Sequence, residues 1–473
     1  MINSIFRTRS PKQAANIRHH VNASTSPAMD TRILPVDVGK IGPMRAKSVT
    51  NDILDELDFQ IDNESIDAQN LQQAAKDLKT SDVPVAFPTE TVYGLGADAT
   101  RSDAVKGIYK AKQRPSDNPL IVHFHSLQQL RSLLHGHASS AANGVGEDPI
   151  PAIYRSLISR FWPGPLTIIL PNPSNSPLAP EVTAGLQTFG ARMPRHLLAL
   201  ALLSLADIPV AAPSANASTK PSPTAAEHVA YDLKGRISTI LDGGPCDVGV
   251  ESTVVDGISQ QPPVVLRPGG ISLEQIRSCP GWEDTQIGYK DTSEKGAQPR
   301  APGMKYRHYS PKATVVLFEA GKSPPSIDEL KAQIGEKARI GLVRTKLWQL
   351  DISASNTITV HESGTKGSTI ERTSSEQGAG FAGMLKSLQE TNWSNIVPTK
   401  HAASIAGNPV ELVDVALGDD TEDVARGIFS ALRDLDRIDV DAIFVEGIDD
   451  NEGSLAAAVM NRLRKAAELR VKD

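Results

Sequence analysis

Short apolar runs alternate with segments of helical periodicity along this chain, and the alternation restricts its fold more than any other feature. Within Ile66–Lys79, the apolar residues Leu71, Ala74, Ala75 and Leu78 recur at helical spacing. Strand-like runs and a further helix follow at Val83–Phe87, Leu120–Phe124, Leu166–Leu170, Leu197–Leu205 (helical) and Pro209–Ala212. Strands that alternate with helices over such a length predict an α/β fold.

The texture of the sequence divides the chain into four segments. We expect an N-terminal extension over residues 1–65, a first α/β domain over 66–272, a linker over 273–312 and a second α/β domain over 313–473. The linker is rich in Gly, Pro, Lys and Tyr and has little periodicity. In the second domain we expect strands at Thr314–Phe318, Ile340–Val343 and Ala442–Val445, a surface loop at Ser368–Gly380, and helices at Asp423–Leu435 and Ser454–Leu469.

The first 29 residues carry basic side chains and no Asp or Glu. Arg7, Arg9, Lys12 and Arg18 lie among Ser and Asn, a composition typical of a mitochondrial presequence. A disordered basic tail explains the same composition as well, and Met29 offers a second start that would give a cytosolic form. We therefore expect residues 1–65 to be largely disordered and the protein to be cytoplasmic, with mitochondrial import as an open alternative.

Composition narrows the classes of partner. Lys and Arg number 49 against 55 Asp and Glu, so the net charge is −6, which argues against a chain that coats nucleic acid or a membrane surface. The two cysteines, Cys246 and Cys279, form no CxxC pair, so a cysteine-based zinc site is not expected. The most apolar stretch, Leu197–Ala212, is too short to span a bilayer.

A basic helix between two polar segments is the first candidate for chemistry. Lys106, Lys110 and Arg114 are four residues apart and share one helix face, while Lys112 lies near the helix end. A solvated charged face is the ordinary interpretation of such a row. The segments on either side of the helix favour a ligand-binding site. Segment 88–97 is rich in hydroxyls and glycines, and it and segment 115–119 lie at expected strand ends, where α/β proteins bind ligands.

A second polar loop follows the expected strand Pro209–Ala212. Ser214 and Asn216 are two residues apart, so an extended chain directs both to one face, and Ser222 follows in a proline-rich turn. Such a loop can bind phosphate or ribose, and an ordinary Asx or Ser turn is the alternative. Arg192 and Arg267 could each bind a carboxylate or phosphate with two parallel hydrogen bonds, although either alone is more often a surface ion pair.

Several common sites are excluded by their missing motifs. No Gly-x-x-x-x-Gly-Lys-Ser/Thr occurs, so a P-loop is excluded, and Gly94-Leu-Gly96 lacks the third glycine of a dinucleotide fingerprint. The Gly-x-Ser-x-Gly elbow is also missing. His123 and His125 alternate along a strand, but no third ligand has metal spacing, so no protein metal site is predicted.

Together these motifs resemble the YrdC-type family. Lys112-Gln-Arg114 and Ser214-Ala-Asn216 match its KxR…SxN signature. The surrounding segments 88–96, 114–123, 161–167 and 266–270 are also similar to the family, and the segment 301–311 resembles the linker of its longer, two-domain form. The resemblance covers about residues 66–470. It implies a twisted α/β domain with a mixed sheet, joined by an ordered linker to a smaller Rossmann-like α/β domain.

The resemblance is to two-domain L-threonylcarbamoyladenylate synthases, and it implies a reaction. L-threonine, bicarbonate and ATP would give threonylcarbamoyl-AMP and pyrophosphate, for modification of adenosine 37 in tRNAs that read ANN codons. It implies Mg²⁺ on the phosphates, a downstream tRNA threonylcarbamoyl transferase as partner, and a weak tRNA contact. Lys112 and Arg114 are the implied catalytic residues. The implied threonine contacts are Thr91, His123, Arg192, Ala212 and Ser252. The implied ATP contacts are Arg114, Asn118, Thr188, Ser214, Asn216, Ser222, Arg267, His308 and Tyr309, with His308 or Tyr309 closing as a lid.

Two rival functions fit parts of the sequence. A nucleic-acid-binding module would use the basic helix, but the net charge of −6 and the uncharged loops count against it. A different carbamoyl-transfer enzyme, such as a hydrogenase maturation factor, would share the first domain. Those proteins carry zinc-finger cysteines that this chain lacks.

Overall fold

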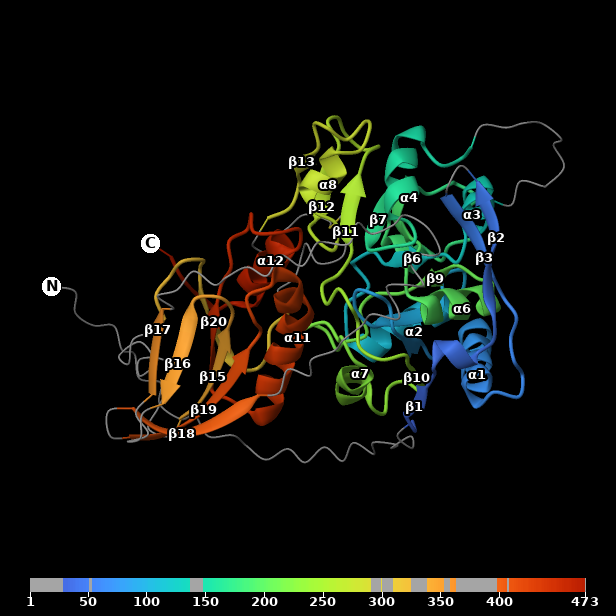
Figure 1. Ribbon diagram of the computed structural model, residues 1–473. Coiled ribbons are helices and arrows are strands. Elements are labelled where there is room, and N and C mark those ends of the chain that lie inside the picture. Colours follow the sequence, from blue (N-terminus) through green and yellow to red (C-terminus); the bar gives the residue numbers. More distant parts are fainter. Residues whose placement is uncertain are drawn as a thin grey trace, which may run out of the picture.

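The computed structural model describes residues 29–50, 53–136, 148–290, 299, 309–324, 338–352, 358–362, 398–405 and 408–472. Figure 1 shows two α/β units side by side, the first drawn in blue to yellow and the second in orange to red. The predicted α/β class and mixed sheet are confirmed by the strand pairing. The predicted loop Ser368–Gly380 and His308 lie outside the described residues.

The first unit is built on an eleven-stranded mixed sheet. Its strands, in spatial order, are β1 (Arg32–Pro35), β10 (Thr239–Asp242), β4 (Val85–Phe87), β5 (Gly94–Asp98), β9 (Val210–Ala211), β6 (Ile121–His123), β8 (Thr188–Arg192), β7 (Leu166–Pro171), β11 (Thr253–Asp256), β12 (Val264–Arg267) and β13 (Gln286–Ile287). Most of these strands are short and buried. Their ends therefore lie close together in the interior, where the connecting loops can meet.

Helices cover the sheet of the first unit. They are α1 (Ile66–Thr80), α2 (Ser102–Lys112), α3 (Leu127–His135), α4 (Arg155–Phe161), α5 (Pro180–Thr183), α6 (Leu197–Ala206), α7 (Ala226–Leu233) and α8 (Leu273–Arg277). The predicted helix Ile66–Lys79 is confirmed as α1, whose apolar face packs on α6. Helix α6 is apolar around its circumference because it lies between the sheet and α1.

The second unit has a mainly parallel six-stranded sheet. Its order is β18 (Thr399–Ile405), β19 (Asn408–Ala416), β15 (Ala338–Arg344), β20 (Ala442–Glu446), β14 (Thr314–Phe318) and β21 (Leu469–Val471), and only β18 runs antiparallel to its neighbour. Strands β16 (Trp348–Ile352) and β17 (Ile358–Glu362) form a hairpin. The predicted strands Thr314–Phe318 and Ala442–Val445 are confirmed, and the two predicted helices are α11 (Thr421–Ile438) and α12 (Ala456–Ala466).

Two expectations about the segments outside the domains differ from the structure. Residues 1–65 were expected to be largely disordered, but Arg32–Pro35 pairs with β10 as an edge strand. Strands β2 (Met44–Thr50) and β3 (Ile53–Phe59) form a hairpin. Residues 273–312 were expected to form a linker, but Gln286–Ile287 pairs with β12 and so extends the first sheet. The two strands that extend the first sheet, β1 and β13, are four and two residues long, which is too short for a periodic pattern.

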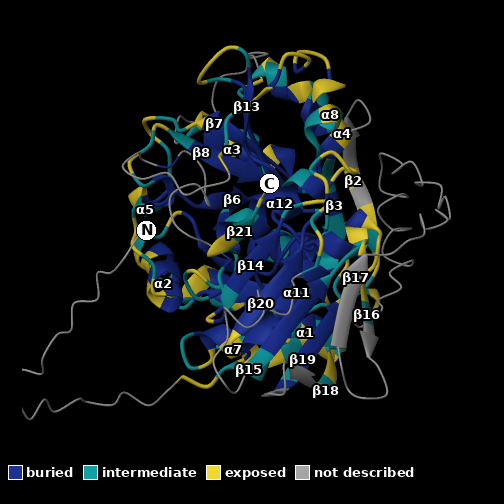
Figure 2. Cartoon of the chain, turned by 90° about the vertical axis from the view of Figure 1, so that its left-hand side faces the viewer, coloured by how far each residue is buried: buried dark blue, intermediate teal, exposed yellow. Residues whose placement is uncertain are grey.

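The two units share a hydrophobic core. Val92 and Val250 of the first unit and Tyr309 pack in one cluster with residues of α11 and α12. Gly249 has φ +78°, and a Cβ there would lie 2.4 Å from the carbonyl oxygen of Ala425, so only glycine permits this approach of α11. Figure 2 shows the buried residues running through the strands and through α11. The second unit therefore packs directly behind the loops that follow the first sheet.

Candidate active site

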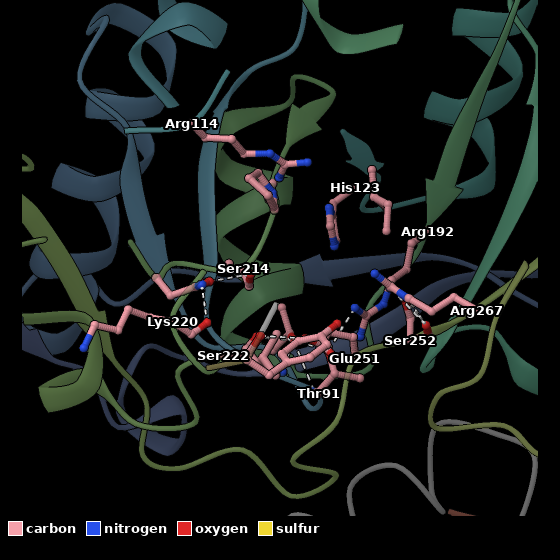
Figure 3. Close-up of a pocket in the computed structure, with 18 residues that line it drawn as sticks. Thr91, Arg114, His123, Arg192, Ser214, Lys220, Ser222, Glu251, Ser252 and Arg267 are labelled. Carbon is pink, nitrogen blue, oxygen red and sulfur yellow. Dashed lines mark hydrogen bonds between the residues drawn. The ribbon is translucent and has the colours of Figure 1, made fainter. Parts of the chain in front are cut away.

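A cavity lies where the short strands of the first sheet end. It contains about 660 Å³ of space free of protein atoms, part of it open to solvent. Its described lining consists of Thr89, Thr91, Val92, Gly94, Arg114, Ile121, His123, Arg192, Ala212, Pro213, Ser214, Asn216, Lys220, Ser222, Glu251, Ser252, Arg267 and Tyr309. Figure 3 shows the labelled arginine, histidine and hydroxyl side chains of this set around the cavity, with the amine of Lys220 directed away from them.

Two loops that are far apart in sequence form one wall. After β4, the segment 88–93 runs beside the segment 213–223 that follows β9. The amide of Tyr93 donates to the carbonyl of Pro223, and the amide of Ala215 donates to the carbonyl of Tyr93. Gly94 and Ser214 form an isolated β-bridge. These backbone bonds hold the two polar loops together.

A buried ion pair lies at the end of β8. The Nη2 of Arg192 lies 2.7 Å from Oε1 of Glu90, and Nη1 donates to Oγ1 of Thr91 at 3.0 Å. Burial favours the neutral form of Glu90, but the charges of Arg192 and Arg195 outweigh it and lower the pKa of Glu90. Because Glu90 and Thr91 engage Arg192, its guanidinium is fixed in orientation.

His123 stands beside this ion pair at the end of β6. Burial is the main cause that lowers the pKa of His123, and the positive charge of Arg192 lowers it further, to about 3. The imidazole is therefore neutral near pH 7. Its Nδ1 finds no hydrogen-bond partner among the residues that the structure describes. A neutral ring next to a cation can contact a substrate by a hydrogen bond without adding positive charge.

Ser252 and Arg267 form the opposite side of the cavity. Arg267 donates through Nε and Nη2 to the carbonyl oxygen of Ser252 at 3.1 and 3.0 Å, and the Ser252 hydroxyl lies 2.8 Å from that of Thr167. A Cβ on Gly269 would lie 2.2 Å from the carbonyl oxygen of Glu251. The Arg-Pro-Gly-Gly motif thus lets the turn after β12 pack against the start of β11.

Lys112 is placed beneath the cavity and does not line it. Its ammonium group donates to the carbonyl oxygens of Ser214 and Asn216, the latter at 2.7 Å, and to Oδ1 of Asn216 at 3.3 Å. Burial is the main cause that lowers the pKa of Lys112, and the positive charge of Arg114 adds to it, so the pKa lies well below its ordinary value. The Lys-x-Arg spacing therefore places one cation under the Ser-x-Asn loop, while Arg114 lines the cavity.

Glu251 connects the cavity to the second unit. Its Oε1 accepts a 2.5 Å hydrogen bond from the Ser222 hydroxyl, and its Oε2 accepts from Nε of Arg462 at 2.9 Å. Burial would raise the pKa of Glu251, but Arg462 and Arg267 outweigh it and lower the pKa to about 2. Glu251 is therefore ionised near neutral pH and neutralises part of the surrounding positive charge.

The structure brings most of the predicted site residues together. Those that line the cavity are Thr91, Arg114, His123, Arg192, Ala212, Ser214, Asn216, Ser222, Ser252, Arg267 and Tyr309. Lys112, Asn118 and Thr188 are described but lie outside the lining. Thr188 begins β8, four residues before Arg192, so it is roughly 13 Å away along the strand. Asn118 is fully buried, and its amide nitrogen and oxygen have no hydrogen-bond partner among the described residues.

Seven residues of the described lining were not predicted from the sequence. These are Thr89, Val92, Gly94, Ile121, Pro213, Lys220 and Glu251. Three of the seven are adjacent to a predicted residue and three more lie two residues from one, so position in the motif was an available signal. Among the described lining residues, Arg114, Arg192, Lys220 and Arg267 are cationic and Glu251 is anionic. The ammonium group of Lys220 pairs with Asp436 of α11, so the arginines supply the positive charge that favours anionic ligands in the cavity.

The sequence matches two family models that together cover most of the chain. Residues 78–269 match the family described as "Telomere recombination", and residues 271–468 match the family described as "Threonylcarbamoyl-AMP synthase, C-terminal domain". Among the described helices, none combines the length and the apolar character needed to cross a membrane.

Three curated relatives carry the name threonylcarbamoyl-AMP synthase. The protein from Schizosaccharomyces pombe is 44% identical over 84% of this chain and 88% of its own length. The protein from Bacillus subtilis is 41% identical over 90% of this chain and 99% of its own length. The protein from Pyrococcus abyssi is 40% identical over 82% of this chain and 91% of its own length.

A solved structure agrees with these relatives. The Sua5 protein of Pyrococcus abyssi in complex with L-threonine has a TM-score of 0.62 and 34% sequence identity, and covers 93% of this chain and all of its own. Both units of the present fold are included in that coverage. The chain therefore belongs to the family of two-domain threonylcarbamoyl-AMP synthases.

Proposed function

We propose that this cavity joins L-threonine and bicarbonate to the adenylate of ATP, giving threonylcarbamoyl-AMP, pyrophosphate and water. The observation that carries the proposal is that one cationic cavity contains residues expected on the threonine side and on the ATP side. The product would supply threonylcarbamoyl for adenosine 37 of tRNAs that read ANN codons.

The chemistry needs positioning and charge compensation. The threonine amine attacks the bicarbonate carbon, and water leaves to give a carbamate. A carbamate oxygen then attacks the α-phosphorus, a P–O bond forms, and the bond to pyrophosphate breaks. Because carbamate and triphosphate are both anionic, cationic side chains must lower their mutual repulsion. No covalent intermediate with the protein is required.

The threonine side is assigned to Thr91, His123, Arg192, Ala212 and Ser252. Arg192 would bind the amino-acid carboxylate, and its bonds to Glu90 and Thr91 hold it in place. The neutral ring of His123 and the hydroxyls of Thr91 and Ser252 would bind the remaining polar groups of threonine.

The ATP side is assigned to the remaining predicted residues. Those in the lining are Arg114, Ser214, Asn216, Ser222, Arg267 and Tyr309. Asn118, Thr188 and His308 are kept in the assignment because the family resemblance implies them. We assign Lys112 to positioning the Ser214–Asn216 segment beneath the nucleotide, in place of the catalytic role expected from the motif.

Mg²⁺ is included on the phosphates of ATP. Among the described residues, no cluster of three or more His, Cys, Asp or Glu side chains is placed to hold a metal ion. The carboxylate in the described lining, Glu251, accepts hydrogen bonds from Ser222 and Arg462. The ion would therefore be held by phosphate oxygens and water, and would neutralise negative charge on those oxygens, which favours attack on the α-phosphorus.

The wider assignment follows the same resemblance. A downstream tRNA threonylcarbamoyl transferase would take the product, with a weak tRNA contact by this chain. We place the protein in the cytoplasm, with mitochondrial import of a form that carries residues 1–28 as a second location. The domain boundaries proposed are 66–272 and 313–473, with 273–312 between them; β1 and β13 lie outside the first range and add edge strands to its sheet.

Release of pyrophosphate tests the proposal. The full-length protein is incubated with ATP and Mg²⁺, with and without threonine and bicarbonate. We expect pyrophosphate only when both are present, and serine should be a poorer substrate because it lacks the methyl group that Ala212 would contact. Pyrophosphate release independent of threonine, or none with every substrate present, would contradict the proposal.

A further inference from the structure

Two helices of the second unit lie against the cavity wall. Helices α11 and α12 stand between the second sheet and the loops of the first unit (Figure 1). Arg462 projects from α12 and is 1% exposed. Its Nε donates to Glu251 at 2.9 Å, and its Nη1 donates to the carbonyl oxygen of Pro268 at 2.5 Å. One buried guanidinium therefore contacts two segments that border the cavity, although Arg462 itself is not part of the lining.

Glu251 links Arg462 to the residues that line the cavity. While Oε2 accepts from Arg462, Oε1 accepts from the hydroxyl of Ser222. Glu251 also precedes Ser252, whose carbonyl oxygen accepts from Arg267. If the arginine were removed, Glu251 would lose its closest cation and would be free to turn toward Arg267. The position of Ser222 and the charge felt by a bound anion would then change together.

Tyr309 is held from the same direction. Its ring stacks on Phe429 of α11, with centroids 5.2 Å apart and planes at 23°. The guanidinium carbon of Arg462 lies 5.8 Å from the ring centroid, within cation–π range. Tyr309 has φ +66°, a left-handed conformation that a non-glycine residue rarely adopts without such support. Residues of both helices thus fix the phenol ring that lines the cavity.

We infer that Arg462 is a positioning residue for the synthesis of threonylcarbamoyl-AMP, acting through Glu251 and Tyr309 from the second unit. The inference rests on the proposed function of the cavity. A guanidinium suits this position because it donates in several in-plane directions, to a carboxylate and a carbonyl oxygen, while its face meets a ring. A lysine at the same place offers one charged group and cannot reproduce all three contacts.

Another arginine of α12 provides a matched control. Arg464 lies two residues further along and is also largely buried, but its ion pairs are with Glu319 and Asp450 of the second unit. Loss of Arg464 should weaken the second unit without altering the cavity wall. A role of Arg462 limited to stability would make the two variants alike in activity.

The test compares Arg462→Gln, Arg462→Lys and Arg464→Gln in the full-length protein. For each, kcat and KM are measured separately for ATP and threonine by pyrophosphate release, beside a urea unfolding curve. We expect Arg462→Gln to lower kcat/KM for ATP roughly tenfold or more, as expected for loss of a hydrogen bond to a charged group. Arg462→Lys should recover part of the loss, and Arg464→Gln should keep wild-type constants whatever its stability. Wild-type constants in Arg462→Gln would overturn the inference.

A double-mutant cycle with Glu251→Gln separates positioning from general damage. If Arg462 acts through Glu251, the double variant should lose much less than the product of the two single losses. Losses that multiply would overturn the inference. If Arg462→Gln does not fold, the cycle is made with Arg462→Lys. The wild-type protein is assayed for threonylcarbamoyl-AMP by mass spectrometry in parallel: an inactive wild type contradicts the proposed function, whereas an active wild type with unaffected Arg462 variants contradicts only the role of Arg462.

Discussion

The guanidinium of Arg192 lies 2.7 Å from the carboxylate of Glu90, and both side chains are buried in the wall of the cavity. The pair joins the segment after β4 to the end of β8, two parts of the chain about a hundred residues apart. Arg192 therefore reaches the cavity as an already oriented cation, and binding of an amino-acid carboxylate would add to a group that is held in place.

Glu90→Ala should destabilise the protein by about 3–5 kcal/mol, because it leaves Arg192 buried without its counter-charge. The free energy of unfolding is measured by urea denaturation at pH 7. Lys106→Ala is the control, since Lys106 pairs with Asp103 on the exposed surface of α2 and such pairs contribute about 0–1 kcal/mol. Equal small losses in the two variants would refute the role given to the buried pair.

Lys112→Met should raise the KM for ATP roughly tenfold, because the Ser214 and Asn216 carbonyl oxygens lose a charged donor. If Lys112 only positions the loop, kcat should change less than KM. Lys110→Met on the exposed face of the same helix should leave both constants unchanged. A large fall in kcat at constant KM would instead support a direct catalytic role for Lys112.

The contribution of Glu251 to stability should depend on pH in a defined direction. Its pKa in the folded protein is about 2, below the ordinary value of 4.5. A depressed carboxylate pKa stabilises the fold above the unfolded-state pKa, and this stability is lost as pH falls from about 4.5 toward about 2. The difference in unfolding free energy between wild type and Glu251→Gln should therefore be constant from pH 7 to 5 and shrink below pH 4.5. A difference that grows on acidification would contradict the assignment of Glu251 as the ionised partner of Arg462.

Arg114→Ala should lower kcat/KM for ATP about 10²-fold or more, since one preorganised charge-stabilising donor contributes that order of rate. Pyrophosphate release with threonine and bicarbonate is the measurement, and the unfolding curve should be nearly unchanged. Arg131→Ala serves as the control, because Arg131 pairs with Asp55 and Asp148 away from the cavity. Near-normal turnover in Arg114→Ala would remove Arg114 from the site.

Local patterns predicted the fold class and much of the site. The basic helix follows from the four-residue spacing of Lys106 and Lys110, the buried helix was expected from the apolar run Leu197–Leu205, and the polar loops at strand ends follow from the α/β pattern. The sequence analysis did not separate Lys112 from Arg114, although the structure places one beneath the loop and the other in the cavity. Arg114 was expected on the same helix face as Lys106 and Lys110, but α2 ends at Lys112. Gln113 follows in a left-handed conformation, φ 53°, and this single turn takes Arg114 off the helix and decides where each cation lies.

Contacts between distant segments could not be predicted. Strand β8 contains Gly190 and only five residues, so its pairing with β6 and β7 depends on neighbours that local sequence does not specify. The contact of the second unit with the cavity wall also joins residues that are far apart in the sequence. Arg462 and Glu251 are 211 residues apart, and an arginine in an amphipathic helix is ordinarily read as a solvated side chain.

The most direct test of the account is the identity of the product. The protein is incubated with ATP, Mg²⁺, L-threonine and ¹³C-labelled bicarbonate, and the mixture is analysed at once by mass spectrometry. The account predicts threonylcarbamoyl-AMP that carries the labelled carbon, in an amount equal to the pyrophosphate released. AMP or ADP without a threonine- and carbon-labelled adenylate would contradict it.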